Sequence, residues 1–207
     1  MNYSATCIEL KPILERILHS EQLHAKWLNT LSYLENCGAR KIAACEHPTL
    51  VKEEMLKHAA EEFRHAHYLK RQLVRVTSRK LEDYSLANVL GGMATLHYLK
   101  RLDMQACRYL IKTGLSKIQV REAAYLLVTY AIECRADTLY PLYDECLRKI
   151  GSKVAVRSIL LEEKEHLNEM REGLKRVSAG IVHAERVCAM EEALYHKWLH
   201  SLEQSII

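Results

Sequence analysis

The sequence predicts an all-α protein, and three observations support this. The 207 residues include only seven Gly and three Pro, and no long β-branched run interrupts them. Leu, Ala, Glu, Lys and Arg, which favour helices, dominate the composition. Apolar residues recur at steps of three and four, the spacing that places them on one helix face. A chain of this length can build one sizeable core, so we predict a single domain over residues 1–207.

The first half of the chain is predicted to form two long helices and a long connection. The first helix spans about residues 7–35 and ends at Asn36-Cys37-Gly38, where Gly38 suits a left-handed cap. The second begins near Pro48 and continues to about residue 77. Residues 78–117 then form a connection with a helix of its own, about 86–111, and a kink at Gly91-Gly92. A connection of this length lets the next helix run alongside its predecessor.

The second half of the chain is predicted to complete the fold with three helices. One covers about 116–148, and Pro141 is expected to kink or split it. The next covers about 152–177. Together with the first two helices they make a bundle over 8–178, and an added C-terminal helix follows at about 183–204.

Composition limits the functional classes. No apolar stretch reaches the roughly 18 residues that a membrane span needs, and no signal peptide is recognisable. Seven scattered Cys without a C-x-x-C motif favour reduced thiols in a cytoplasmic protein. A net charge of +4 permits contact with nucleic acid without arguing for it.

Two segments, EEFRH at 61–65 and EEKEH at 162–166, each place a Glu three residues before a His. Such a pair lies on one helix face, one turn apart. Glu62 and Glu163 also fall on otherwise apolar stripes, where a carboxylate is costly unless it is paired or bound to metal. The pairs Glu62/His65 and Glu163/His166 are therefore candidate metal ligands.

Two further helices are expected to supply one carboxylate each. Measured from the turn between the first two helices, Glu21 and Glu62 lie at about 22 and 21 Å. On this measure Glu35 is too near the turn and Glu15 too far from it. Measured in the same way from the turn between their two helices, Glu133 lies level with Glu163 and His166. Four carboxylates and two imidazoles suit two iron or two manganese ions.

The order Glu, Glu-x-x-His, Glu, Glu-x-x-His resembles the ferritin-like di-iron carboxylate superfamily, most specifically at EEFRH. The second motif departs from the family pattern because Glu165 stands where Arg is usual. The resemblance implies a four-helix bundle with a crossover connection, two iron ions (or manganese), and Glu62 and Glu133 as metal-bridging ligands. It also implies that Glu162 orients His65. We place Asp137 as the partner of His166, and Tyr130 near the metals.

The resemblance implies activation of O2 and oxidation or hydroxylation of an organic substrate, with an electron donor as a further partner. A pocket lined by residues such as Phe63, Leu126 and Tyr130 would favour this function. The alternatives are a ferroxidase or iron-storage protein, a metal-binding protein without turnover, and a helical protein with buried ion pairs. A homodimer is compatible with all of them.

Within the superfamily, AIECRA at 131–136 and the 71-residue step from Glu62 to Glu133 are similar to small tRNA hydroxylases that act on a prenylated adenosine. This similarity makes tRNA a candidate partner. The basic stretch from Lys70 to Lys80 is interpreted as a solvated face, with RNA contact as the alternative. Other acidic and imidazole side chains, including Glu61 and His58, are interpreted as solvated or core residues.

Overall fold

The computed structural model describes residues 4–207, and side chains from residue 8 onward. Every regular element within residues 4–207 is helical, which confirms the predicted all-α class. The elements are α1 (Ser4–Leu18), α2 (Glu21–Cys45), α3 (Glu53–Gln72), the 3₁₀ turn η1 (Leu73–Arg75), α4 (Gly92–Lys112), α5 (Lys117–Lys149), α6 (Arg157–Leu174) and α7 (Gly180–Ser205). Among these helices, none has a stretch long and apolar enough to cross a membrane. No disulfide is present among the described cysteines.

The predicted helix over residues 7–35 is wrong, because the chain breaks after Leu18 and starts a second helix at Glu21. Ser20 adopts an extended conformation there, and its hydroxyl accepts a hydrogen bond from the Leu23 N–H at 3.3 Å. This is an N-cap, which satisfies one of the amide groups left unpaired at the start of a helix. The sequence pattern missed the cap because the apolar stripe continues across the break.

The predicted end of the first helix at Gly38 is also wrong, since α2 continues to Cys45. Gly38 allows α2 to approach Glu62 of α3 closely, and it does not form a left-handed cap. A Cβ placed on Gly38 would lie 3.4 Å from Oε2 of Glu62 on α3. The missing side chain lets α2 and α3 pack closely along their lengths, and this packing brings α2 carboxylates level with α3.

Glycine instead takes left-handed conformations at the start of α4. Gly91 and Gly92 have φ values of 74° and 52°, so the pair begins the helix and does not kink it. On α5 the expected disruption at Pro141 is absent, because the helix runs without interruption from Lys117 to Lys149. One uninterrupted helix therefore carries Glu133 and Tyr140 on the same side of the molecule as α2.

The start of α5 provides a local test of helix stability. The Ser116 hydroxyl accepts from the Gln119 N–H, and the Gln119 side chain accepts from the Ser116 N–H, forming a capping box. We expect Ser116→Ala to lower the free energy of unfolding by about 1 kcal/mol, and Ser116→Gly by only a few tenths. Urea unfolding followed by circular dichroism measures both. Equal losses in the two variants would contradict the capping role.

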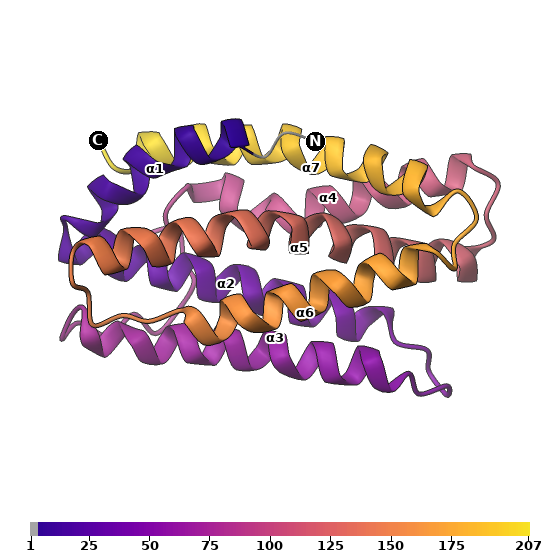
Figure 1. The fold of residues 1–207 in the computed structure, drawn as a ribbon, viewed down its shortest axis with the longest axis horizontal. Helices are drawn as coiled ribbons and strands as arrows, with labels where there is room; N and C mark the ends of the chain where they lie inside the picture. The colour runs from indigo at the N-terminus through magenta and orange to yellow at the C-terminus, as the bar shows by residue number, and fades with distance from the viewer. Residues whose placement is uncertain (1–3) are drawn as a thin grey trace.

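The helices run roughly along one direction in Figure 1, with α1 and α7 at the upper edge of the view and α3 at the lower edge. Helix α2 packs along α3, and α5 packs along α6, while α4 lies against α5 and α7. Ion pairs between side chains connect α3 to α6, for example Lys57 Nζ to Glu169 Oε1 at 2.8 Å. Elements far apart in sequence thus surround one interior.

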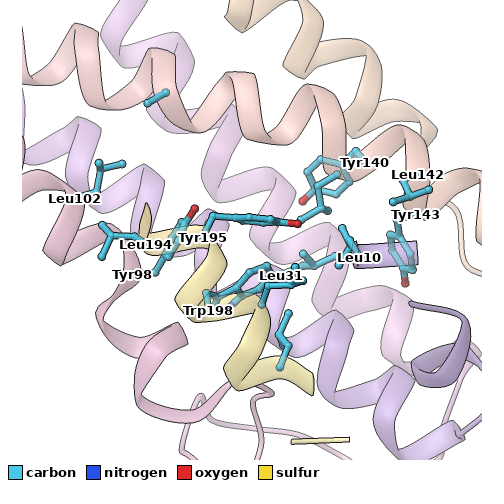
Figure 2. Close-up of a cluster of buried hydrophobic side chains, with 14 of the residues drawn as sticks. Leu10, Leu31, Tyr98, Leu102, Tyr140, Leu142, Tyr143, Leu194, Tyr195 and Trp198 are labelled. Carbon is cyan, nitrogen blue, oxygen red and sulfur yellow. The ribbon is translucent and has the colours of Figure 1, made fainter. Parts of the chain in front are cut away.

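The apolar core extends from Leu10 of α1 to Ile206 after α7 in one connected cluster. Figure 2 shows part of it, where Trp198 and Tyr195 of α7 lie among leucines and tyrosines from other helices. The Trp198 indole stacks near Trp27 at 6.0 Å between ring centroids, and its N–H donates to the Thr95 hydroxyl at 2.8 Å. Helix α7 is therefore an integral part of the core.

A buried ion pair also fixes α7 to α5. The Arg135 guanidinium donates from Nε and Nη2 to the two carboxylate oxygens of Glu191, each at 2.8 Å. The Tyr98 hydroxyl of α4 donates to the same carboxylate, and the Tyr195 ring lies 3.6 Å from the Arg135 guanidinium carbon. All four side chains are buried, so the charges are satisfied within the protein.

Candidate metal centre

Helices α3 and α6 bring both predicted Glu-x-x-His pairs together. Glu62, His65, Glu163 and His166 are all buried. Nδ1 of His65 lies 3.0 Å from Oε1 of Glu163, and Nδ1 of His166 lies 3.4 Å from Oε1 of Glu62. Each imidazole therefore faces the carboxylate of the opposite pair, as two facing helices require.

Helix α5 adds Glu133 as predicted, but its nearest imidazole belongs to a residue that the sequence pattern missed. His58, one turn before Glu62 on α3, is fully buried. Its Nε2 lies 3.2 Å from Oε1 of Glu133 and 3.5 Å from Oε1 of Glu62. Its ring lies 4.1 Å from that of His166, measured between centroids. His58 is thus a core residue, as one of the two interpretations had it, but its contacts make it part of the cluster.

The prediction of Glu21 as a ligand is wrong. Glu21 is exposed at the first residue of α2. The carboxylate that α2 supplies is Glu35, which was rejected as too near the turn. Because α2 extends to Cys45, Glu35 lies about 15 Å from its end, and Glu62 lies about 14 Å from the start of α3. The error in the helix end therefore displaced the expected ligand by four turns.

The outer ring nitrogens of His65 and His166 have carboxylate partners on the opposite helix. Nε2 of His65 lies 2.7 Å from Glu162, the predicted partner, which also accepts from Arg64 at 2.5 Å. Nε2 of His166 lies 2.8 Å from Glu61. The prediction of Asp137 for this position is therefore wrong, as is the interpretation of Glu61 as an ordinary solvated charge.

Two tyrosines of α5 differ in their relation to the cluster. The Tyr140 hydroxyl donates to the carboxylate of Glu35. Tyr130, which was predicted to lie near the metals, has Cys134 as a neighbour instead. Burial, reinforced by that thiol, raises the pKa of Tyr130 to about 12. Tyr140 is therefore the tyrosine in direct contact with a candidate ligand.

Buried polar atoms that make no hydrogen bond concentrate in this carboxylate–histidine cluster, which consists of Glu35, His58, Glu62, His65, Glu133, Glu163 and His166. Across the described side chains, seven buried nitrogen or oxygen atoms lack a hydrogen-bond partner, and six of them belong to the cluster. Buried polar groups in proteins are normally satisfied, so each exception needs an explanation. A bound cation would satisfy carboxylate oxygens and imidazole nitrogens at once, and the donor set fits one.

The pKa shifts of the cluster residues also support a bound cation. Burial raises the pKa of Glu133 well above its ordinary value, and the nearby Glu163 adds to the effect. Burial also raises the pKa of Glu35, together with the charge on Glu62. Although burial alone would lower it, hydrogen bonds to Glu163 and Glu62 raise the pKa of His166 to about 11. Without a cation, the cluster is neutralised only by holding protons.

The cluster divides into two groups of four donors, each within 4.8 Å of one another. The two-histidine group contains His58, Glu62, Glu133 and His166. The one-histidine group contains Glu35, Glu62, His65 and Glu163. Each group has donors that could hold a metal ion, and Glu62 is common to both groups.

A small cavity of about 70 Å³ adjoins the four carboxylates of the cluster. Its remaining lining is mostly apolar and comes from α2, α4 and α5, with Leu34, Leu99 and Ile132 among the contributors. The imidazoles do not line it. The carboxylate side of the cluster therefore faces a largely apolar space.

A larger groove of about 750 Å³ lies between α3, α5 and α6 near the start of α7. Met55, Leu126 and Met170 are among its lining residues. Met55 precedes His58 by three residues and Met170 follows His166 by four, so the groove lies about one helical turn from the imidazoles. Leu126 and Phe63 were both predicted to line a pocket. Leu126 lines this groove, whereas Phe63 does not and is 45% exposed.

The chain matches no family model, no curated protein and no solved structure in the comparisons made. The functional argument therefore rests on the cluster itself.

Proposed function

We propose that this protein is a ferritin-like di-iron carboxylate oxidoreductase that uses O2 to oxidise an organic substrate. The observation that carries the proposal is the convergence of four carboxylates and three imidazoles in the core, where six of their atoms make no hydrogen bond. In this proposal α2, α3, α5 and α6 are the four-helix bundle, and α4 lies in the crossover connection. A cytoplasmic location is consistent with O2-dependent chemistry of this kind.

The charge of the cluster supports two divalent cations. Its four carboxylates carry four negative charges when ionised, and two divalent ions supply four positive charges. An uncompensated buried charge costs several kcal/mol, which makes a neutral assembly strongly favoured. Carboxylate and imidazole donors suit iron and manganese, and thiolates, which favour zinc or copper, are absent from the cluster.

Each residue has a defined role in the proposal. Glu62 would contact both ions, since it belongs to both donor groups. Glu133 belongs to the two-histidine group, and its predicted bridging role remains a prediction. Glu61 and Glu162 hold His166 and His65 in the orientation that points Nδ1 into the cluster. Two iron ions bound here would supply the electrons that reduce O2.

The outer carboxylates give a testable expectation. Partners of metal-bound histidines typically change metal affinity by about 10–100-fold when removed. We expect Glu61→Gln to weaken iron binding by about this factor, because the charged acceptor that raises the basicity of His166 becomes a neutral amide. Glu165→Gln, which changes a neighbouring carboxylate on α6, is the matched control. Equal iron affinities of the two variants in anaerobic titrations would contradict the role of Glu61.

The cavity and the groove differ in size, so they suit different substrates. An engineered cavity of about 150 Å³ accepts benzene, so a space of about half that size suits O2 and not an aromatic ring. The groove is large enough for an organic molecule. We therefore assign O2 to the cavity and the organic substrate to the groove.

A ferroxidase is the second candidate, and the small cavity favours it, because iron and O2 would then be the only substrates. A tRNA substrate has less support. Lys70 donates to Asn29 and to the Leu81 carbonyl, and Arg75 donates to the Lys153 carbonyl. Arg75 is exposed, as a solvated face requires, whereas Lys70 is half-buried. The contacts that both residues make within the protein favour a structural role over RNA binding.

Oxygen consumption separates the candidates. The protein is loaded anaerobically with two Fe(II) per chain, and O2 uptake is followed with hydroquinone as the organic probe. We expect continued O2 uptake and formation of benzoquinone while two irons per chain stay bound, and loss of both in Glu133→Gln. Uptake that follows each further addition of Fe(II), with hydroquinone unchanged, would establish the ferroxidase instead. Uptake unaffected by Glu133→Gln would contradict both functions.

A further inference from the structure

We propose that the two metal positions are unequal, and that His58 makes the two-histidine group the position that fills first and selects Fe(II) over Mn(II). The inference rests on the proposed function, because it concerns the metals of the same centre. It goes further in predicting an order of filling and a centre that can hold one iron and one manganese.

The inequality follows from the donor atoms. The two-histidine group offers two imidazole nitrogens and two carboxylates, whereas the one-histidine group offers one nitrogen and three carboxylates. Imidazole suits iron, and carboxylate suits manganese. Sites of a given donor type also bind Fe(II) more tightly than Mn(II), and nitrogen donors enlarge that difference. Fe(II) is therefore expected in the two-histidine group.

His65 and His166 do not cause the difference between the two donor groups, because the two imidazoles have matching surroundings. His65 and His166 each point Nδ1 into the cluster and place Nε2 within 2.8 Å of a carboxylate on the facing helix. A carboxylate partner raises the basicity of a ligating imidazole, and here both imidazoles have one. The difference between the groups therefore lies in His58 on one side and Glu35 on the other.

Glu35 is the weaker donor of these two. The Tyr140 hydroxyl donates to its carboxylate, which leaves less electron density for a cation. The one-histidine group therefore combines fewer nitrogens with one carboxylate already engaged by a proton donor.

The contacts of His58 support a ligand role. The residue is fully buried, and its Nε2 faces Glu133 and Glu62. Its other nitrogen, Nδ1, has no hydrogen-bond partner in the described chain. The polar contacts of this imidazole within the described chain are therefore made with the cluster. A histidine kept only for core packing would be expected to bond elsewhere, since unpaired buried groups are costly.

The test is an anaerobic titration of metal-free protein with Fe(II) and separately with Mn(II), followed by calorimetry and by the electron paramagnetic resonance of bound Mn(II). For the wild type we expect two binding steps whose affinities for Fe(II) differ at least tenfold. With one equivalent of each metal present, we expect one iron and one manganese per chain.

The variant His58→Phe keeps a ring of similar size and removes the nitrogen donors, and His97→Phe on α4 is the matched control. We expect His58→Phe to lose the tighter Fe(II) step and the preference for iron, with the weaker step unchanged. If His58→Phe does not fold, the two-step titration of the wild type still decides the question. Two equal steps in the wild type would overturn this inference and leave the proposed function standing, whereas binding of no metal would overturn both.

Discussion

Replacing Glu133 with Gln is expected to remove metal from the two-histidine group while leaving the metal-free protein at least as stable as the wild type. Glu133 is buried, and its Oε2 lacks a partner. The Gln side chain has the same shape without the charge, so it removes repulsion among carboxylates. Like charges held close together in a low-dielectric interior repel one another, so removing one of them should not destabilise the metal-free protein.

Two melting curves of each protein test this expectation. In the wild type, Fe(II) under anaerobic conditions should raise the melting temperature, because a ligand that binds only the folded state stabilises it. In Glu133→Gln the metal-free melting temperature should equal or exceed that of the wild type, and the response to Fe(II) should be much smaller. A metal-free variant that melts well below the wild type would show that Glu133 serves stability rather than metal binding.

Replacing Glu191 with Ala is expected to produce the largest loss of stability. The substitution removes both acceptors of the buried Arg135 guanidinium and the acceptor of the Tyr98 hydroxyl. Breaking a buried ion pair on one side costs about 3–5 kcal/mol, because an uncompensated charge remains. The free energy of unfolding, measured with urea, should fall by this amount.

The double variant Arg135→Met with Glu191→Leu is the control. It removes both charges and fills the space with apolar atoms, so most of the lost stability should return. A loss below about 1 kcal/mol in Glu191→Ala alone would contradict the account, because the pair would then resemble an exposed salt bridge.

The sequence predicted the fold class and the two Glu-x-x-His pairs well, because both depend on spacing within one helix. Glu62 and His65 lie on one face whatever surrounds them, and a carboxylate on an apolar stripe stands out in the pattern. Glu133 could be placed by its distance from the turn after its helix, because α5 ends at Lys149, close to the predicted end at about residue 148.

The errors arose where the position of a residue depended on contact between helices. Glu35 was rejected because Gly38 was interpreted as a helix end, although it permits the close packing of α2 on α3. His58 lies four residues before Glu62, a spacing that places it on the same face, but the Glu-x-x-His pattern does not include it. The partner of His166 is on α3, and no pattern within α5 or α6 could indicate Glu61.

The central claim is that the cluster binds two metal ions, and the metal content of the purified protein tests it most directly. The protein is prepared from iron-rich cells and again after anaerobic loading with Fe(II), and bound metal is measured by mass spectrometry after gel filtration. We expect about two metal ions per chain in the wild type, with strong loss in Glu62→Ala and His166→Ala. A wild-type protein that retains no metal after anaerobic loading would contradict the claim and leave a helical protein with buried ion pairs.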